Sequence, residues 1–275
     1  VCIDKNHFRI ISSAATRERD KFHIKKYLSE NIEIKDVTDD YCVFGLFGPK
    51  SRDLIKTLSK DNFENDNFKF GTAKYILIDG IKIWAQRLSY VGELGYELYI
   101  KFDEAKKIYE LLIEKGKDFN LSNCGMHAMD IMRMESGFLH WGHDISPEEN
   151  QYQAGLSFTI SNKKNIDFIG KKALEKIKKV KIKNKFAMFT LKDSKPGEPL
   201  LLHDEPIYLE DKIIGKTTSG NYSFNFKKNL TFGYIKNDYS NNELQSKNLF
   251  VEVEKQKYPI ELIKEPLKKT NFKNN

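Results

Sequence analysis

The stretch "SYVGELGYELYI", residues 89–100, concentrates groups that could do chemistry: two glycines, two carboxylates and three tyrosines. The spacing of Gly92 and Gly95 predicts a tight turn, in which Gly95 is free to take a positive φ. After the turn, the alternation of a β-strand places Glu97 on the face opposite Tyr96.

A carboxylate on a strand of aromatic and aliphatic residues needs hydrogen-bond donors if it is buried. A flat heterocycle with adjacent N–H groups, such as a pterin or a guanine, offers two donors to one carboxylate. In the alternative interpretation, Glu97 is an exposed strand residue and Tyr90 belongs to the core. These residues by themselves leave both interpretations open.

A second group of chemically capable residues lies in "MDIMRMESGFLHWGHDI". Asp130, Arg133 and Gly137 are spaced i, i+3, i+7, so they are expected on one helix face, and an intrahelical salt bridge would explain the first two. His140 and His143 follow in a turn, but a second pair of ligands at metal-binding spacing is missing from the sequence, so no metal site is expected. Nucleophile motifs of serine or cysteine hydrolases are also missing.

The elements that must position these residues form a mixed pattern, which predicts an α+β fold with a sheet layered by helices. A hairpin is expected at Asp79-Gly80, between two apolar runs. Strands are predicted at 7–15, 41–48, 74–79, 81–88 and 96–100, and helices at 16–31, 49–60, 102–120, 124–139 and 167–179.

The composition changes after about residue 184, where short strands at hairpin spacing begin and the turns contain Gly, Asn and Asp. This pattern predicts a small antiparallel β-barrel or sandwich of roughly 85 residues. We therefore expect one domain at 1–184, a barrel at 185–268 and a frayed tail at 269–275.

The formal charge is 46 − 39 = +7. A basic surface suits polyanions, but no nucleic-acid-binding signature accompanies it, so we expect no nucleic-acid partner. No apolar run approaches the roughly 18 residues of a membrane span, so we expect no membrane either. Three widely separated cysteines favour a reducing compartment, either the cytoplasm or the mitochondrial matrix. Val1 is not a natural initiator, which indicates a processed chain or a fragment.

Several of these motifs, in this order, resemble the glycine-cleavage T-protein (aminomethyltransferase) superfamily. "YVGELGYEL" resembles its Y-x-G-E-x-G-x-E strand, and "FGLFGPKSRDLI" resembles its G-P-x-S motif. "AMDIMRMESGFLHWGHDI", "DFIGKKAL" and "GKTTSGNYSFNFKKNLTFGYI" are similar to three further family motifs. The W-G-H-D-I loop is most similar to that of the folate-binding half of dimethylglycine and sarcosine dehydrogenases.

The resemblance implies α+β subdomains and a β-barrel around a folate channel. It also implies an activity, in which a one-carbon unit passes from an amine to tetrahydrofolate to give 5,10-methylenetetrahydrofolate. FAD would be a cofactor only of a flavin dehydrogenase domain, either covalently linked or separate. The implied folate-binding residues are Glu97, which clamps the pterin, Tyr90, which lines the pocket, Glu93 and Gly95, which shape the turn, and Arg133 and Trp141 near the channel.

The chain departs from the family pattern in two places. The resemblance puts the catalytic aspartate in a segment before the strand that matches Val1 onward, so no catalytic residue is named here. The family motif T-P-x-E-A-G-L reads "NQYQAGL" at residues 150–156. Two alternatives to the transferase therefore remain: a non-catalytic folate-binding or scaffold relative, and a folate-dependent demethylase of a sulfonium compound.

Overall fold

The computed structural model describes residues 1–160 and 167–269. They separate into two compact units, an N-terminal unit (Val1–Gly125) and a C-terminal unit (Met126–Lys269), each with its own core. The boundaries expected from the sequence at residues 184 and 268 remain a prediction, and the tail beyond Lys269 lies outside the described residues.

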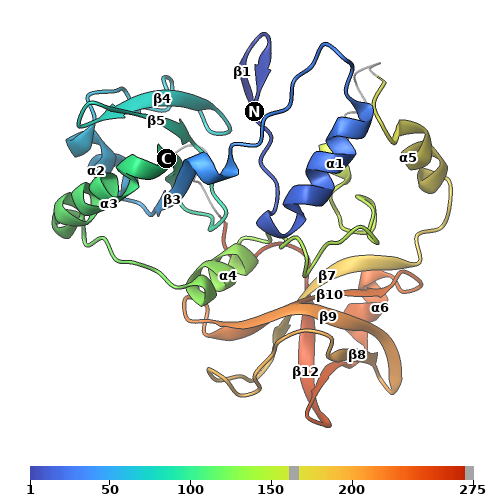
Figure 1. Cartoon of the computed structure of the whole chain (residues 1–275). Helices are drawn as coiled ribbons and strands as arrows, with labels where there is room; N and C mark the ends of the chain where they lie inside the picture. Colours follow the sequence, from blue (N-terminus) through green and yellow to red (C-terminus); the bar gives the residue numbers. More distant parts are fainter. Residues whose placement is uncertain (161–166, 270–275) are drawn as a thin grey trace. The chain divides into compact units, whose positions relative to one another are not determined.

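The N-terminal unit is built on a four-stranded antiparallel sheet in the order β3-β6-β5-β4, beside a small β1-β2 hairpin (Figure 1). Its elements are β1 (Cys2–Asp4), β2 (His7–Phe8), α1 (Arg17–Tyr27), β3 (Tyr41–Phe47), α2 (Ser51–Leu58), β4 (Ala73–Ile78), β5 (Ile81–Gln86), β6 (Gly95–Lys101) and α3 (Phe102–Gly116), with short 3-10 turns at Ala14–Thr16, Thr38–Asp40 and Lys117–Phe119.

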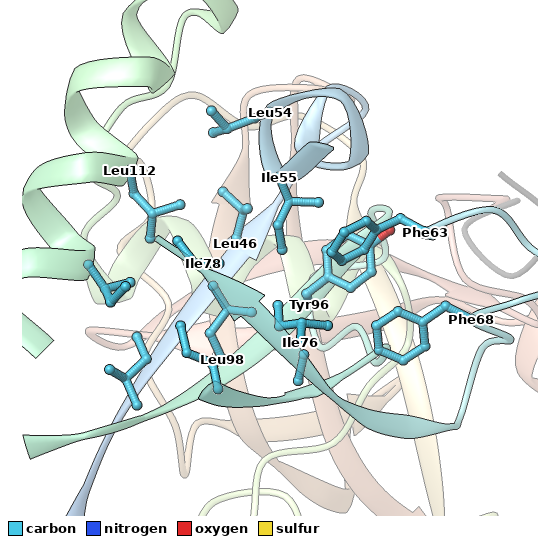
Figure 2. Packing of buried hydrophobic residues seen from close by; sticks show 14 of the residues in the cluster. Leu46, Leu54, Ile55, Phe63, Phe68, Ile76, Ile78, Tyr96, Leu98 and Leu112 are labelled. Atoms are coloured by element: carbon cyan, nitrogen blue, oxygen red, sulfur yellow. The ribbon is translucent and has the colours of Figure 1, made fainter. Parts of the chain in front are cut away.

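One face of this sheet carries the core of the unit, because β-strands present alternate residues to opposite faces. Leu54 and Ile55 of α2 and Ile108 of α3 pack there against inward residues of all four strands. Figure 2 shows this cluster, in which Tyr96 lies beside Phe63. The opposite face of the sheet carries Glu97.

The C-terminal unit begins with α4 (Met126–Glu135) and ends in a closed six-stranded barrel, in the order β10-β7-β12-β11-β8-β9 (Figure 1). The described strand pairs in it are all antiparallel, which confirms the barrel expected from the sequence. Its other elements are the turn Ser157–Thr159, α5 (Lys171–Lys178), β7 (Asn184–Leu191), β8 (Pro206–Leu209), β9 (Lys212–Ser223), β10 (Lys228–Lys236), α6 (Asn241–Ser246), β11 (Leu249–Val253) and β12 (Gln256–Ile263).

Local expectations at three places were wrong. The strand predicted at 7–15 forms only at His7–Phe8. Gly95 does not have a positive φ, whereas Gly92 does, at +68°. Helix α4 ends at Glu135, so Gly137, with φ +73°, lies in the turn after the helix and not on its face.

Candidate functional site

Residues 89–100 comprise the bend that follows β5 and most of β6. Tyr90 and Glu93 lie in the bend between these strands, and the Ser89 hydroxyl accepts a hydrogen bond from the Glu93 backbone N–H at 3.0 Å. Gly95 then opens β6, and Glu97 follows two residues later. Four of the predicted site residues are therefore held by one bend and one strand.

Gly95 is required by close packing, because it lies opposite Phe47 in the ladder. A Cβ at residue 95 would lie 2.1 Å from a Phe47 ring carbon and 2.6 Å from the Leu46 carbonyl oxygen. The glycine thus allows β3 and β6 to approach each other next to Glu97.

Glu97 lies between two unlike neighbours in the sheet. Gly45 is opposite it on β3, and Gln86 is opposite it on β5. Residues directly opposite in an antiparallel pair share a face and have Cβ atoms about 5 Å apart. The carboxylate therefore has a residue without a side chain on one flank and an amide on the other.

Tyr99 lies on the same face and orients the carboxylate. Its hydroxyl donates to Glu97 Oε2 at 3.0 Å. Burial raises the pKa of the Tyr99 hydroxyl, and the Glu97 charge raises it further. The hydroxyl therefore stays protonated and remains a donor.

Three buried nitrogens on this face have no hydrogen-bond partner among the described residues: Arg9 Nη1, Trp84 Nε1 and Gln86 Nε2. Buried polar groups in folded proteins nearly always have a partner, so each of these donors requires an explanation. The Arg9 guanidinium carbon lies 5.2, 5.3 and 5.7 Å from the ring centres of Tyr41, Trp84 and Tyr99, within cation–π range.

Sequence reasoning did not name Arg9, Trp84 or Gln86 as site residues. A signal was available for two of them, since alternation along "IKIWAQ" places Trp84 and Gln86 opposite the buried Ile83 and Ala85. No such signal existed for Arg9, because its place over the three rings depends on the path of the chain after β2.

The other two predicted site residues belong to the C-terminal unit. Arg133 is 1% exposed and donates to Asp130 and Asp144, to the Phe138 carbonyl and to the Ser219 hydroxyl. The i, i+3 salt bridge expected with Asp130 is present at 2.8 Å, but the fully buried partner is Asp144. With so many bonds inside its own unit, Arg133 holds the turn after α4 onto β9.

Trp141 lies in that turn, is 38% exposed and pairs with Ile145 in an isolated bridge. The next residues, Gly142 and His143, line a hollow of about 970 Å³ on β8, β9 and β10 of the same unit. The turn that carries Trp141 therefore borders this hollow through Gly142 and His143.

The "NQYQ" segment holds its backbone through two reciprocal side-chain hydrogen bonds. Asn150 Oδ1 accepts from the Gln153 backbone N–H at 3.1 Å, and Gln153 Oε1 accepts from the Asn150 backbone N–H at 3.1 Å. This is the reciprocal pattern of a capping box. An Asn–Gln pair thus makes, without a charge, the bonds that the family's Thr–Glu pattern is suited to make.

Within the described residues, no group of three or more His, Cys, Asp or Glu side chains could hold a metal ion. A search of the same residues finds no helix long and apolar enough to cross a membrane. The three cysteines are free thiols.

An α+β unit with an outward carboxylate, followed by a closed antiparallel barrel, defines a bipartite T-protein-like fold. Residues 1–164 match the family model of the GCVT N-terminal domain, and residues 184–269 match that of the glycine cleavage T-protein C-terminal barrel domain. The chain belongs to the glycine cleavage T-protein family.

Solved and curated relatives agree with this assignment. The crystal structure of glycine cleavage system aminomethyltransferase T from Bartonella henselae has the same fold, with a TM-score of 0.77, 20% identity and coverage of 94% of this chain and 67% of that one. Mitochondrial dimethylglycine dehydrogenase from Homo sapiens is 34% identical over 238 residues, or 86% of this chain. An aminomethyltransferase from Alkaliphilus metalliredigens is 28% identical over 273 residues, which cover 98% of this chain and 71% of that protein.

Proposed function

We propose that this chain is the folate-binding part of an enzyme that transfers a one-carbon unit from an amine to tetrahydrofolate, forming 5,10-methylenetetrahydrofolate. The amine would be dimethylglycine, sarcosine or glycine. The chain spans 27% of the length of human dimethylglycine dehydrogenase. The proposal therefore includes the possibility of a longer polypeptide, in which this chain would be the folate-binding part.

The observation that carries the proposal is the position of Glu97. Its carboxylate lies on the sheet face opposite the core, is oriented by the Tyr99 hydroxyl and is flanked by Gly45. No hydrogen bond from a described residue occupies its other oxygen. A pterin presents two adjacent N–H donors at one edge, which is the pattern that a single oriented carboxylate binds.

The other residues would support this contact. Tyr90 would lie against the ring, while Glu93 and Gly95 set the bend and its approach to β3. Arg133 would act as a positioning residue for the turn that carries Trp141. Tetrahydrofolate supplies the amine nitrogens that accept the one-carbon unit, and the residues of this chain bind and orient it.

The partners follow from the same proposal. A flavin-containing dehydrogenase domain, linked or separate, would deliver the one-carbon unit, and FAD would belong to that domain. Human dimethylglycine dehydrogenase and human sarcosine dehydrogenase are named as mitochondrial. We propose the mitochondrial matrix or the cytoplasm for this chain.

The test is calorimetric titration with tetrahydrofolate of the chain with any flanking sequence that its gene encodes. Glu97→Gln keeps the size of the side chain and removes the charge, so we expect binding about 10- to 100-fold weaker. Glu114→Gln, the same change at an exposed residue of α3, is the matched control and should bind normally. Equal affinity of the Glu97→Gln variant and the unchanged chain would reject the pterin clamp.

A further inference from the structure

Gln86 on β5 lies directly opposite Glu97 on β6. Gln86 is 1% exposed, and its Nε2 atom has no hydrogen-bond partner among the described residues. Burying an amide N–H without a partner costs about 1–3 kcal/mol. A buried, unpaired amide next to an oriented carboxylate is the arrangement of a site that awaits an acceptor.

The chemistry of the proposed ligand supplies that acceptor. The pyrimidinone edge of a pterin presents two N–H donors followed by a carbonyl oxygen. Glu97 can accept from the two donors, and an amide N–H on the same face, one strand away, matches the carbonyl. Gly45, on the other flank of Glu97, has no side chain that could make this contact.

We infer that Gln86 is a specificity-determining residue of this site, which donates its amide N–H to the carbonyl oxygen of the pterin while Glu97 accepts from the adjacent N–H groups. This inference rests on the proposed function, and it adds to it a protein donor for the pterin carbonyl oxygen. Glu97 and Gln86 together bind an edge with two donors followed by an acceptor. They therefore discriminate against rings in which an amino group replaces the carbonyl.

The inference predicts opposite effects on stability and on binding. Gln86→Met has nearly the same volume and removes the unpaired donor, so the chain without ligand should melt roughly 2–4 °C higher. The same substitution should weaken tetrahydrofolate binding about tenfold, because the ring carbonyl is left unpaired. Gln245→Met, at an exposed residue of α6, is the control and should change neither quantity.

An analogue of the ligand isolates the proposed contact between Gln86 and the pterin carbonyl oxygen. The unchanged chain should prefer tetrahydrofolate over its 4-amino analogue, and the Gln86→Met variant should lose about tenfold of that preference. Other effects of the 4-amino group are shared by both proteins and cancel in this comparison.

The possible results of these experiments separate the inference about Gln86 from the proposed function. A Gln86→Met variant that binds tetrahydrofolate normally overturns the inference but leaves the pterin clamp of Glu97 standing. Weaker binding together with a lower melting temperature means that Gln86 is structural, and it overturns the inference as well. If the unchanged chain binds no tetrahydrofolate, the proposed function and this inference both fail.

Discussion

Arg133 and Asp144 form an ion pair that solvent does not reach, with side chains 1% and 0% exposed. Asp144 also accepts from the hydroxyls of Thr218 and Ser219 at 2.6 and 2.8 Å and from the His140 backbone N–H at 2.9 Å. This carboxylate therefore joins the end of α4, the following turn and strand β9 within the C-terminal unit.

Breaking this pair from either side should be costly. Arg133→Met leaves the buried Asp144 carboxylate without a cationic partner, which we expect to destabilise the chain by about 3–5 kcal/mol. Asp144→Leu leaves the buried Arg133 with only the partly exposed Asp130 as its anionic partner, so we expect a smaller loss. The double variant buries no unpaired charge, so its loss should be smaller than the sum of the two single losses. Urea unfolding of the four proteins checks this, and additive losses would contradict it.

The glycines beside Glu97 should respond unequally to a methyl group. Gly95→Ala places a Cβ against the Leu46 carbonyl oxygen, which is part of the backbone, whereas the nearest atoms to a Cβ in Gly45→Ala belong to the Phe47 ring, the first at 2.5 Å. We expect a loss of about 2–3 kcal/mol for Gly95→Ala and less for Gly45→Ala, because a side chain can move aside. Denaturant unfolding of both variants measures the order, and equal losses would disprove the packing argument.

The hydroxyl of Tyr96 is a weak point of the N-terminal core. Tyr96 is 0% exposed, its ring contacts Phe63 and Phe68, and its hydroxyl has no hydrogen-bond partner among the described residues. Tyr96→Phe keeps the ring and removes the unpaired group, so stability should rise by about 1 kcal/mol. Thermal unfolding checks this against Tyr75→Phe, an exposed site that should be neutral. A loss of stability in Tyr96→Phe would indicate that a buried water satisfies the hydroxyl.

His140 should make the C-terminal unit sensitive to mild acid. Burial lowers the pKa of His140, and His143 and Arg133 lower it further, against the opposing effect of Asp130 and Asp144. The unfolded chain therefore takes up this proton at a higher pH than the folded chain, so stability is lost as the pH falls below about 6.5.

The measurement is urea unfolding at pH 7.5 and pH 5.5. Replacing the imidazole in His140→Gln should reduce the loss between these two pH values, although other groups still contribute to it. An equal loss in both proteins would show that His140 does not govern this response.

The elements that depend on local sequence were predicted correctly. The Asp79-Gly80 hairpin forms because both residues can take positive φ, and they do so at 49° and 78°. A short apolar run was likewise sufficient to predict β3, alternation to predict β6, and hairpin spacing to predict the strands of the barrel. The family assignment followed from motifs whose order can be read from the chain alone.

Predictions that required knowledge of neighbours failed. Gly95 was assigned a conformational role, but its reason is the 2.6 Å approach of a Cβ to the Leu46 carbonyl oxygen on another strand. The "HFRIISSAA" segment has the alternation of a strand, yet it forms a strand only at His7–Phe8, and beyond these residues Arg9 exchanges two backbone hydrogen bonds with Val1. Strand pairing depends on a neighbour that the segment itself does not encode.

The sequence by itself determined the class of fold, the family and the position of Glu97 on the face of its strand opposite Tyr96, because periodicity and motif order are properties of the chain. Only the tertiary structure decided which residues surround that carboxylate. Register across three strands placed Gly45 and Gln86 beside Glu97, and folding left the Gln86 amide buried and unpaired. Such neighbours are set by strand pairing and packing between distant segments, and no local pattern records them.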